Sequence, residues 1–114
     1  MDSTNAIAAL GSLAQEHRLA VFRLLVQAGD DGLAAGAIAE ALGVPASSLS
    51  FHLAHLHRAG MIRQQRQGRS LIYSADYRAM DSLVGYLMEN CCAGMGCAAA
   101  APTQPSSRPK RKSA

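Results

Sequence analysis

The sequence predicts a mainly α-helical fold with one small β-hairpin, on the strength of three observations. Apolar residues recur at three- and four-residue intervals in five segments, which is the spacing of amphipathic helices. Aromatic residues make up only 4% of the chain and tryptophan is absent, so a core of Leu, Ile, Val and Ala fits better than an aromatic-rich sheet sandwich. Residues 61–74 instead place strand-like Ile62, Leu71 and Tyr73 around a polar tip that contains a glycine.

Five helices are expected, over residues 4–14, 15–28, 33–42, 46–59 and 76–91. Gly43 suits the left-handed position that ends the third helix, and Pro45 suits the entry to the fourth. The apolar residues of the first helix recur at Ile7, Leu10, Leu13 and Ala14. In the second helix we expect four side chains to point inward: Leu19, Phe22, Leu25 and Val26.

The fifth predicted helix has an apolar stripe, which predicts that it packs against a partner helix. Its members step by three, four, three and four residues, at Tyr77, Met80, Val84, Leu87 and Cys91. Beyond it, residues 99–114 hold alanines, prolines, serines and a basic run but no core-forming residues. We therefore expect a single domain over residues 1–98 and a disordered basic tail over residues 99–114.

Length and composition narrow the class of protein. A chain of 114 residues and 11.9 kDa allows one compact domain, and 49% hydrophobic residues are enough for its core. No apolar run approaches the roughly 20 residues of a membrane span, and the N-terminus lacks the regions of a secretory signal. We expect a cytoplasmic protein with no membrane partner, whose three cysteines are thiols rather than structural disulfides.

The net charge of +3 is concentrated in two patches. Residues 61–74 hold Arg63, Arg66 and Arg69 without an acid, and residues 102–114 hold four basic residues. The rest of the chain is slightly acidic. Local positive patches are the usual footprint of phosphate binding, although ordinary solvated charge is the alternative.

Helix, glycine turn, helix and basic hairpin is the layout of a winged helix-turn-helix. In the fourth helix, Leu49, Leu53 and Leu56 form the docking stripe. The opposite face and its flanks predict DNA contacts by Ser47, Ser48, Ser50, Phe51 and His55. Hydroxyl groups bond base edges or phosphates, and a phenyl ring suits the thymine methyl group. The alternatives for Phe51 are packing between subunits or plain exposure.

The hairpin tip predicts a second DNA contact. Arg66 and Arg69 flank Gly68, so their guanidinium groups would lie along or in the minor groove. The alternative is a polar turn that touches nothing.

These residues resemble the ArsR/SmtB family of winged-helix repressors over about residues 6–89. The resemblance rests on Glu16-His17-Arg18-Leu19, Ile38-Ala39-Glu40-Ala41-Leu42-Gly43, Ser47-Ser48-Leu49-Ser50-Phe51-His52-Leu53, Leu56, Arg58-Ala59-Gly60-Met61-Ile62, Arg66-Gln67-Gly68-Arg69 and Tyr73. It implies a homodimer built from the first and last helices that binds an inverted-repeat operator in double-stranded DNA. Ser47, Ser50 and Phe51 fall at its base-facing positions.

The effector must be inferred from the ligands present. Where many arsenic and cadmium sensors of this family carry a Cys-Val-Cys signature, residues 33–38 have no thiol or imidazole, and the last helix lacks the histidine of zinc sensors. Instead, all three cysteines fall within seven residues, at Cys91, Cys92 and Cys97. Three thiols suit a soft ion, whereas zinc would want four ligands. Arsenite, As(III), or Sb(III) is therefore the expected effector, with no organic cofactor.

This arrangement is similar to a variant of arsenic-responsive members that keep cysteines after the last helix. The predicted function is a DNA-binding repressor that trivalent arsenic releases, not an enzyme. Several alternatives stay open: a redox sensor that forms a Cys92–Cys97 disulfide, a sensor of another soft metal, a thiol-based metalloid carrier or enzyme, incidental cysteines with Cys91 in the core, and a winged-helix interaction module without DNA.

Overall fold

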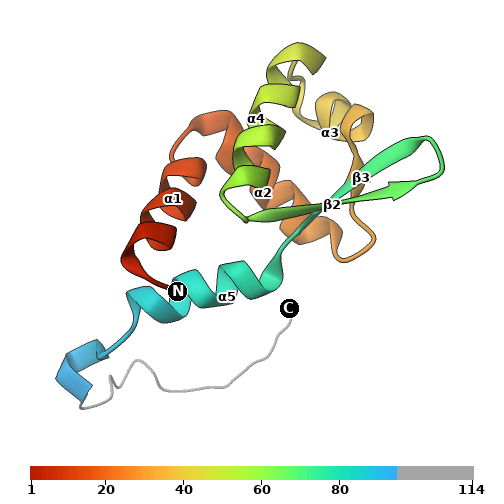
Figure 1. Ribbon diagram of the computed structural model, residues 1–114. Coiled ribbons are helices and arrows are strands. Elements are labelled where there is room, and N and C mark those ends of the chain that lie inside the picture. The colour runs from red at the N-terminus through yellow and green to blue at the C-terminus, as the bar shows by residue number, and fades with distance from the viewer. Residues whose placement is uncertain (95–114) are drawn as a thin grey trace.

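The computed structural model describes residues 1–94, and its five helices and its hairpin follow the expected order (Figure 1). They are α1 (Ser3–Leu13), α2 (Glu16–Ala28), β1 (Leu33–Ala34), α3 (Ala35–Leu42), α4 (Ala46–Arg58), β2 (Ile62–Gln67), β3 (Ser70–Ala75), α5 (Tyr77–Leu87) and a 3-10 turn at Cys91–Gly94. The mainly helical, winged helix-turn-helix prediction is confirmed. Cys97, the tail predicted over residues 99–114 and the domain end at residue 98 lie outside the described residues.

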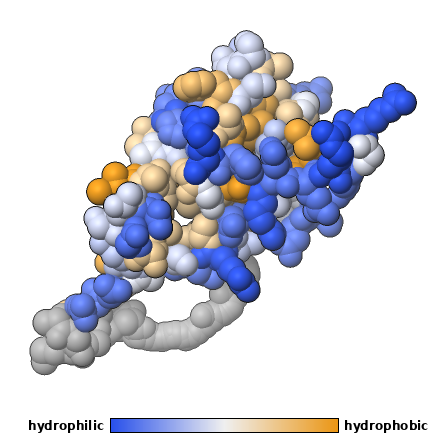
Figure 2. Space-filling view, viewed as in Figure 1, coloured by the Kyte–Doolittle hydropathy of each residue, from blue (hydrophilic) through white to orange (hydrophobic). Residues whose placement is uncertain are grey.

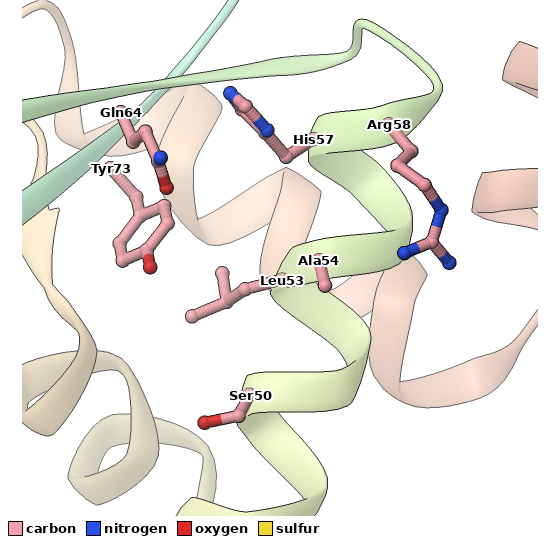
Figure 3. Close-up of a pocket in the computed structure, with 7 residues that line it drawn as sticks. All are labelled: Ser50, Leu53, Ala54, His57, Arg58, Gln64 and Tyr73. Carbon is pink, nitrogen blue, oxygen red and sulfur yellow. The ribbon is translucent and has the colours of Figure 1, made fainter.

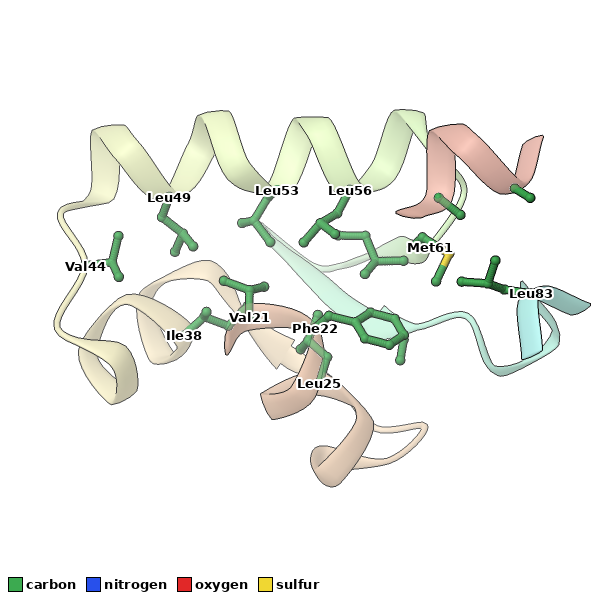
Figure 4. Packing of buried hydrophobic residues seen from close by; sticks show 14 residues of the cluster. Val21, Phe22, Leu25, Ile38, Val44, Leu49, Leu53, Leu56, Met61 and Leu83 are labelled. Atoms are coloured by element: carbon green, nitrogen blue, oxygen red, sulfur yellow. The ribbon is translucent and has the colours of Figure 1, made fainter. Parts of the chain in front are cut away.

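The core forms where α4 lies over α2 and α3 (Figure 4). The predicted docking stripe is confirmed, because Leu49, Leu53 and Leu56 are at most 2% exposed. They point toward Val21 of α2 and Ile38 of α3, which are also fully buried. Burying each of these side chains contributes about 1.5–3 kcal/mol. The stripe therefore fixes which face of α4 is left for solvent.

Two predictions in the first half of the chain are wrong: the start of the third helix at Leu33 and the inward orientation of Leu19. Leu33 and Ala34 form strand β1 rather than the start of a helix, and β1 pairs with Tyr73 and Ile72 of β3. The sheet therefore has three antiparallel strands in the order β1-β3-β2. Gly32 makes this approach possible, since its φ is +68° and a Cβ there would overlap the carbonyl oxygen of Tyr73.

The second correction concerns Leu19, which is 45% exposed rather than inward. Helix α2 turns Val21, Phe22 and Leu25 to the core instead. Helix α1 likewise buries small Ala6 and Ala9 against its neighbours, half-buries Leu13 and leaves Ile7 and Leu10 exposed. Small side chains at Ala6 and Ala9 let α1 lie close to its neighbours.

Helix α5 ends at Leu87, four residues before the expected end at Cys91. Asn90 has a φ of +59°, a left-handed conformation that short polar side chains tolerate and that a helix cannot continue through. Cys91 therefore lies in a separate 3-10 turn rather than on the apolar stripe of α5. Among residues 1–94, no helix has the length and apolarity that a membrane span requires.

Candidate nucleic-acid interface

The outer face of α4 presents small hydroxyl side chains around one aromatic ring. Ser47, Ser48 and Ser50 are exposed, and Phe51 is 62% exposed. These side chains face solvent because the opposite face of α4 packs against the core. The phenyl ring meets His52 and His55 edge to face, with ring centroids 5.8 and 6.4 Å apart. The structure therefore places four of the predicted DNA-contacting residues on one solvent face.

His52 lies on the inner side of this face. It is only 8% exposed, and its ring centroid is 5.5 Å from that of His17 on α2. Burial lowers the pKa of His52, and the nearby positive charges of His17, Arg18 and His55 lower it further. Its Nδ1 atom is buried without a hydrogen-bond partner among residues 1–94. The side chain is therefore held neutral at neutral pH.

His55 is half-buried rather than fully presented to DNA. It lines a hollow with Ala8 and Gly11 of α1, and burial, followed by the charges of Arg18 and Arg58, lowers its pKa. Its predicted contact with a phosphate stays a prediction.

Strands β2 and β3 form the predicted wing, which projects from the body as hydrophilic surface (Figures 1 and 2). Gln67 pairs with Ser70, so Gly68 and Arg69 make the turn, and Gly68 has a left-handed φ of +63°. Arg66 and Arg69 are both exposed at this tip. The two predicted arginines are thus brought together, well away from the core.

A cleft of about 300 Å³ separates α4 from the wing (Figure 3). Ser50, Leu53 and His57 line it from α4, and Gln64 and Tyr73 line it from the strands. Of these, only Ser50 was expected at a functional site. The hairpin register was the available signal, because a turn at Gly68 and Arg69 pairs Gln64 with Tyr73 across the strands.

Cys91 and Cys92 lie after α5, although the predicted helix ran to Cys91, and Cys92 is disulfide-bonded rather than the thiol that we expected. The Sγ atoms of Cys91 and Cys92 are 3.7 Å apart, and Cys92 has a left-handed φ of +57°. No group of three potential metal ligands is assembled within the described part of the chain. The three-thiol site with Cys97 therefore stays a prediction.

The docked helix-turn-helix of α3 and α4, beside a basic hairpin, defines a winged helix-turn-helix protein of the DNA-binding class. A family model described as a helix-turn-helix domain matches residues 13–65. The HTH-type transcriptional regulator YgaV of Escherichia coli (strain K12) is 30% identical over 87 residues, which cover 76% of this chain and 86% of the relative. The transcriptional activator HlyU of Vibrio cholerae is 30% identical over 86 residues, 73% of this chain and 77% of the relative.

Solved structures agree with these relatives. HlyU has been solved in a form described as reduced, with a TM-score of 0.61 and 26% identity over 79% of this chain and 92% of that chain. The DNA-binding domain of Mb0332 from Mycobacterium bovis is described as homodimeric and as a possible ArsR-family regulator. It has a TM-score of 0.62 and 24% identity, over 80% of this chain and 84% of that chain. The chain belongs to the ArsR/SmtB family of winged-helix transcriptional regulators.

Proposed function

We propose that this regulator is a homodimeric repressor that binds an inverted-repeat operator and is released by trivalent arsenic or antimony on Cys91, Cys92 and Cys97. The observation that carries the DNA-binding part is the outer face of α4, where three serines and Phe51 are exposed above a fully buried leucine stripe. Such a face fits the major groove, and the wing arginines would reach the adjacent minor groove.

The dimer is supported by large apolar side chains that the single chain leaves in solvent. On α1 they are Ile7, 67% exposed, and Leu10, 42% exposed. On α5 and at its C-terminal cap they are Val84, Leu87 and Met88, each more than half exposed. Helices α1 and α5 contact each other, so the exposed residues belong to neighbouring elements (Figure 1). A second copy of the chain would bury these residues in a two-fold interface. The two α4 helices of that dimer would then lie about 34–36 Å apart.

The effector is supported by the closeness of two cysteine sulfur atoms. The Sγ atoms of Cys91 and Cys92 are 3.7 Å apart, close enough for both to bond one ion once a thiol reductant has opened the disulfide of Cys92. Trivalent arsenic bonds to three sulfurs, and Cys97 is the third in sequence. The 3-10 turn follows α5 directly, so an ion there would act on the dimer helix and change the angle between the two α4 helices. A coupling of about 1–3 kcal/mol would lower operator affinity roughly 5–150-fold.

The test begins with a duplex selected by the wild-type protein from a random library, because the operator is defined by what the protein prefers. Gel shifts on this duplex are then compared with and without arsenite. We expect a dimer-sized complex that arsenite dissociates. No preferred duplex would overturn the DNA-binding part, and a complex that persists at saturating arsenite would overturn only the effector part.

A second candidate is a redox sensor that uses the same thiols. This sensor would form the predicted Cys92–Cys97 disulfide. The disulfide-bonded state of Cys92 favours it, and HlyU is a relative for which a reduced form is distinguished. In this mechanism two thiols lose two electrons and two protons to a peroxide, and one disulfide forms. Release of the selected duplex by peroxide but not by arsenite, reversed by a thiol reductant, would favour this candidate.

A further inference from the structure

We propose that the cleft between α4 and the wing binds one phosphate group of the operator backbone, through the hydroxyls of Ser50 and Tyr73 and the amide of Gln64. This inference rests on the proposed DNA-binding function. It extends the recognition face of α4, through Ser50, to a contact with the strands of the wing. It also gives a role to Gln64 and Tyr73, two residues on the strands rather than at the tip.

The shape of the cleft supports a small polar ligand. Its volume of about 300 Å³ is near that of ten water molecules, which is room for a phosphodiester group and part of its sugar. The side chains of Ser50, Gln64 and Tyr73 extend toward this space from opposite walls, with Leu53 between them (Figure 3). Arg58 of α4 also lines the cleft, so the ligand would meet one positive charge beside the uncharged hydrogen-bond donors.

The chemistry of the lining favours an anion that accepts hydrogen bonds. No Asp or Glu is among its lining residues, while two hydroxyls, an amide and the imidazole of His57 can each donate. Within residues 1–94, none of the side-chain hydrogen bonds engages Ser50, Gln64 or Tyr73. Their donors are therefore available to a ligand. Serine, glutamine and tyrosine are among the side chains that commonly bond DNA phosphates.

The place of the cleft in the fold identifies the source of the phosphate. If α4 enters the major groove and the tip at Arg66 and Arg69 reaches the minor groove, the strand that separates these grooves must pass between α4 and the wing. Ser50 lies beside Phe51 on α4, so the cleft opens next to the recognition face. A phosphate held there would fix the position of α4 relative to the wing on the DNA.

Uncharged contacts have a distinct signature in binding experiments. Replacing a neutral donor removes no counterion-releasing charge, so affinity should fall while the salt slope stays the same. The contact reads no base, so affinity for selected and random duplexes should fall by the same factor.

The test is a double-mutant cycle between Tyr73→Phe and single methylphosphonate substitutions along the selected duplex. Phenylalanine keeps the ring and removes only the hydroxyl. We expect Tyr73→Phe to weaken binding roughly ten-fold, with an unchanged salt slope. Methylphosphonate at one position in each half-site should lower the DNA affinity of the wild type by a similar factor. The same substitution should lower the affinity of Tyr73→Phe little further. Tyr86→Phe, a half-buried tyrosine on α5, is the matched control and should behave as wild type at every phosphate.

Two results would overturn the assignment while leaving DNA binding intact. In the first, Tyr73→Phe and each methylphosphonate lower the DNA affinity independently, so that their fold-changes multiply at every position. The other is competition by millimolar inorganic phosphate that Tyr73→Phe abolishes without any methylphosphonate coupling, which would make the cleft a site for a free phosphate compound. Failure of the wild type to select any duplex would instead overturn the proposed function, and this inference with it.

Discussion

The ring of Phe51 meets the ring of its neighbour His52 edge to face, with centroids 5.8 Å apart and planes at 66°. The two residues differ sharply in exposure, 62% for Phe51 and 8% for His52. A buried imidazole thus braces an aromatic ring that the core does not cover. The ring is therefore presented at a defined place on the outer face of α4.

This placement predicts that Phe51 reads a thymine methyl group. Replacing the contacted thymine by uracil should weaken wild-type binding by about 0.8 kcal/mol, or roughly four-fold, because one buried methyl group is lost. Fluorescence anisotropy on uracil-scanned duplexes measures this loss.

Phe51→Ala is compared with the wild type in the same assay. Its affinity should not change when the contacted thymine is replaced by uracil. Its free energy of unfolding should stay within about 0.5 kcal/mol of wild type, whereas Leu53→Ala in the buried stripe should cost about 2–5 kcal/mol. An equal uracil effect in both proteins would show that the ring does not read that methyl group.

Stability should decline in mild acid because of His52. Its pKa is lowered by burial first and by neighbouring positive charges second, so the unfolded chain takes up a proton more readily than the folded one. The contribution is complete above about pH 6.5, the ordinary histidine pKa, and is lost progressively as the pH falls below it. Urea unfolding at a series of pH values measures this slope.

His52→Gln should flatten the slope but leave a residual one, because the pKa of His55 is lowered in the same direction. His57→Gln, at an exposed position on the same helix, is the control and should keep the wild-type slope. If His52→Gln keeps the full wild-type slope of unfolding free energy against pH, a group other than His52 is responsible for the loss of stability in acid.

The wing arginines should act through phosphate charge. Arg66→Gln and Arg69→Gln should each reduce the slope of log affinity against log salt by about one and weaken binding to all sequences alike. Titrations at several salt concentrations give the slope, and Gln65→Ala on the same strand is an uncharged control. If the double arginine variant keeps the wild-type slope, the tip touches no phosphate.

The apolar residues of α5 should hold the dimer together. Leu87→Glu places a charge in the proposed interface, so sedimentation should show monomers at concentrations where the wild type is dimeric, and operator binding should fall with it. Ser82→Glu introduces the same charge at an exposed position nearly opposite Val84 on that helix, and should remain dimeric. A dimeric Leu87→Glu protein would move the interface away from this surface.

The parts predicted correctly from the sequence are those that local physics determines. The period of Leu49, Leu53 and Leu56 gave the docking face, and Gly43 indeed ends α3 with a φ of +66°. Strand β1 escaped prediction because two residues carry no period, and their pairing depends on β3 some forty positions away. Leu19 was misplaced because burial in α2 follows the fit against neighbouring helices, which a single helix does not reveal.

The candidate sites divide in the same way. Exposure of the α4 serines and wing arginines follows from helix period and hairpin register. The cleft between α4 and Tyr73 needs two elements to meet in space, so its lining could not be read from a motif. The cysteine site depends on where α5 stops, and apolar spacing carried the predicted helix past Asn90.

Titration of the selected duplex complex with arsenite tests whether the cysteines after α5 couple trivalent arsenic to operator binding. Antimonite, zinc and peroxide serve as comparison reagents, and Cys91→Ser, Cys92→Ser and Cys97→Ser as variants. We expect arsenite or antimonite to lower wild-type affinity roughly 5–150-fold and each serine variant to stay bound. Unchanged wild-type affinity at saturating arsenite, or equal release of the serine variants, would contradict this expectation.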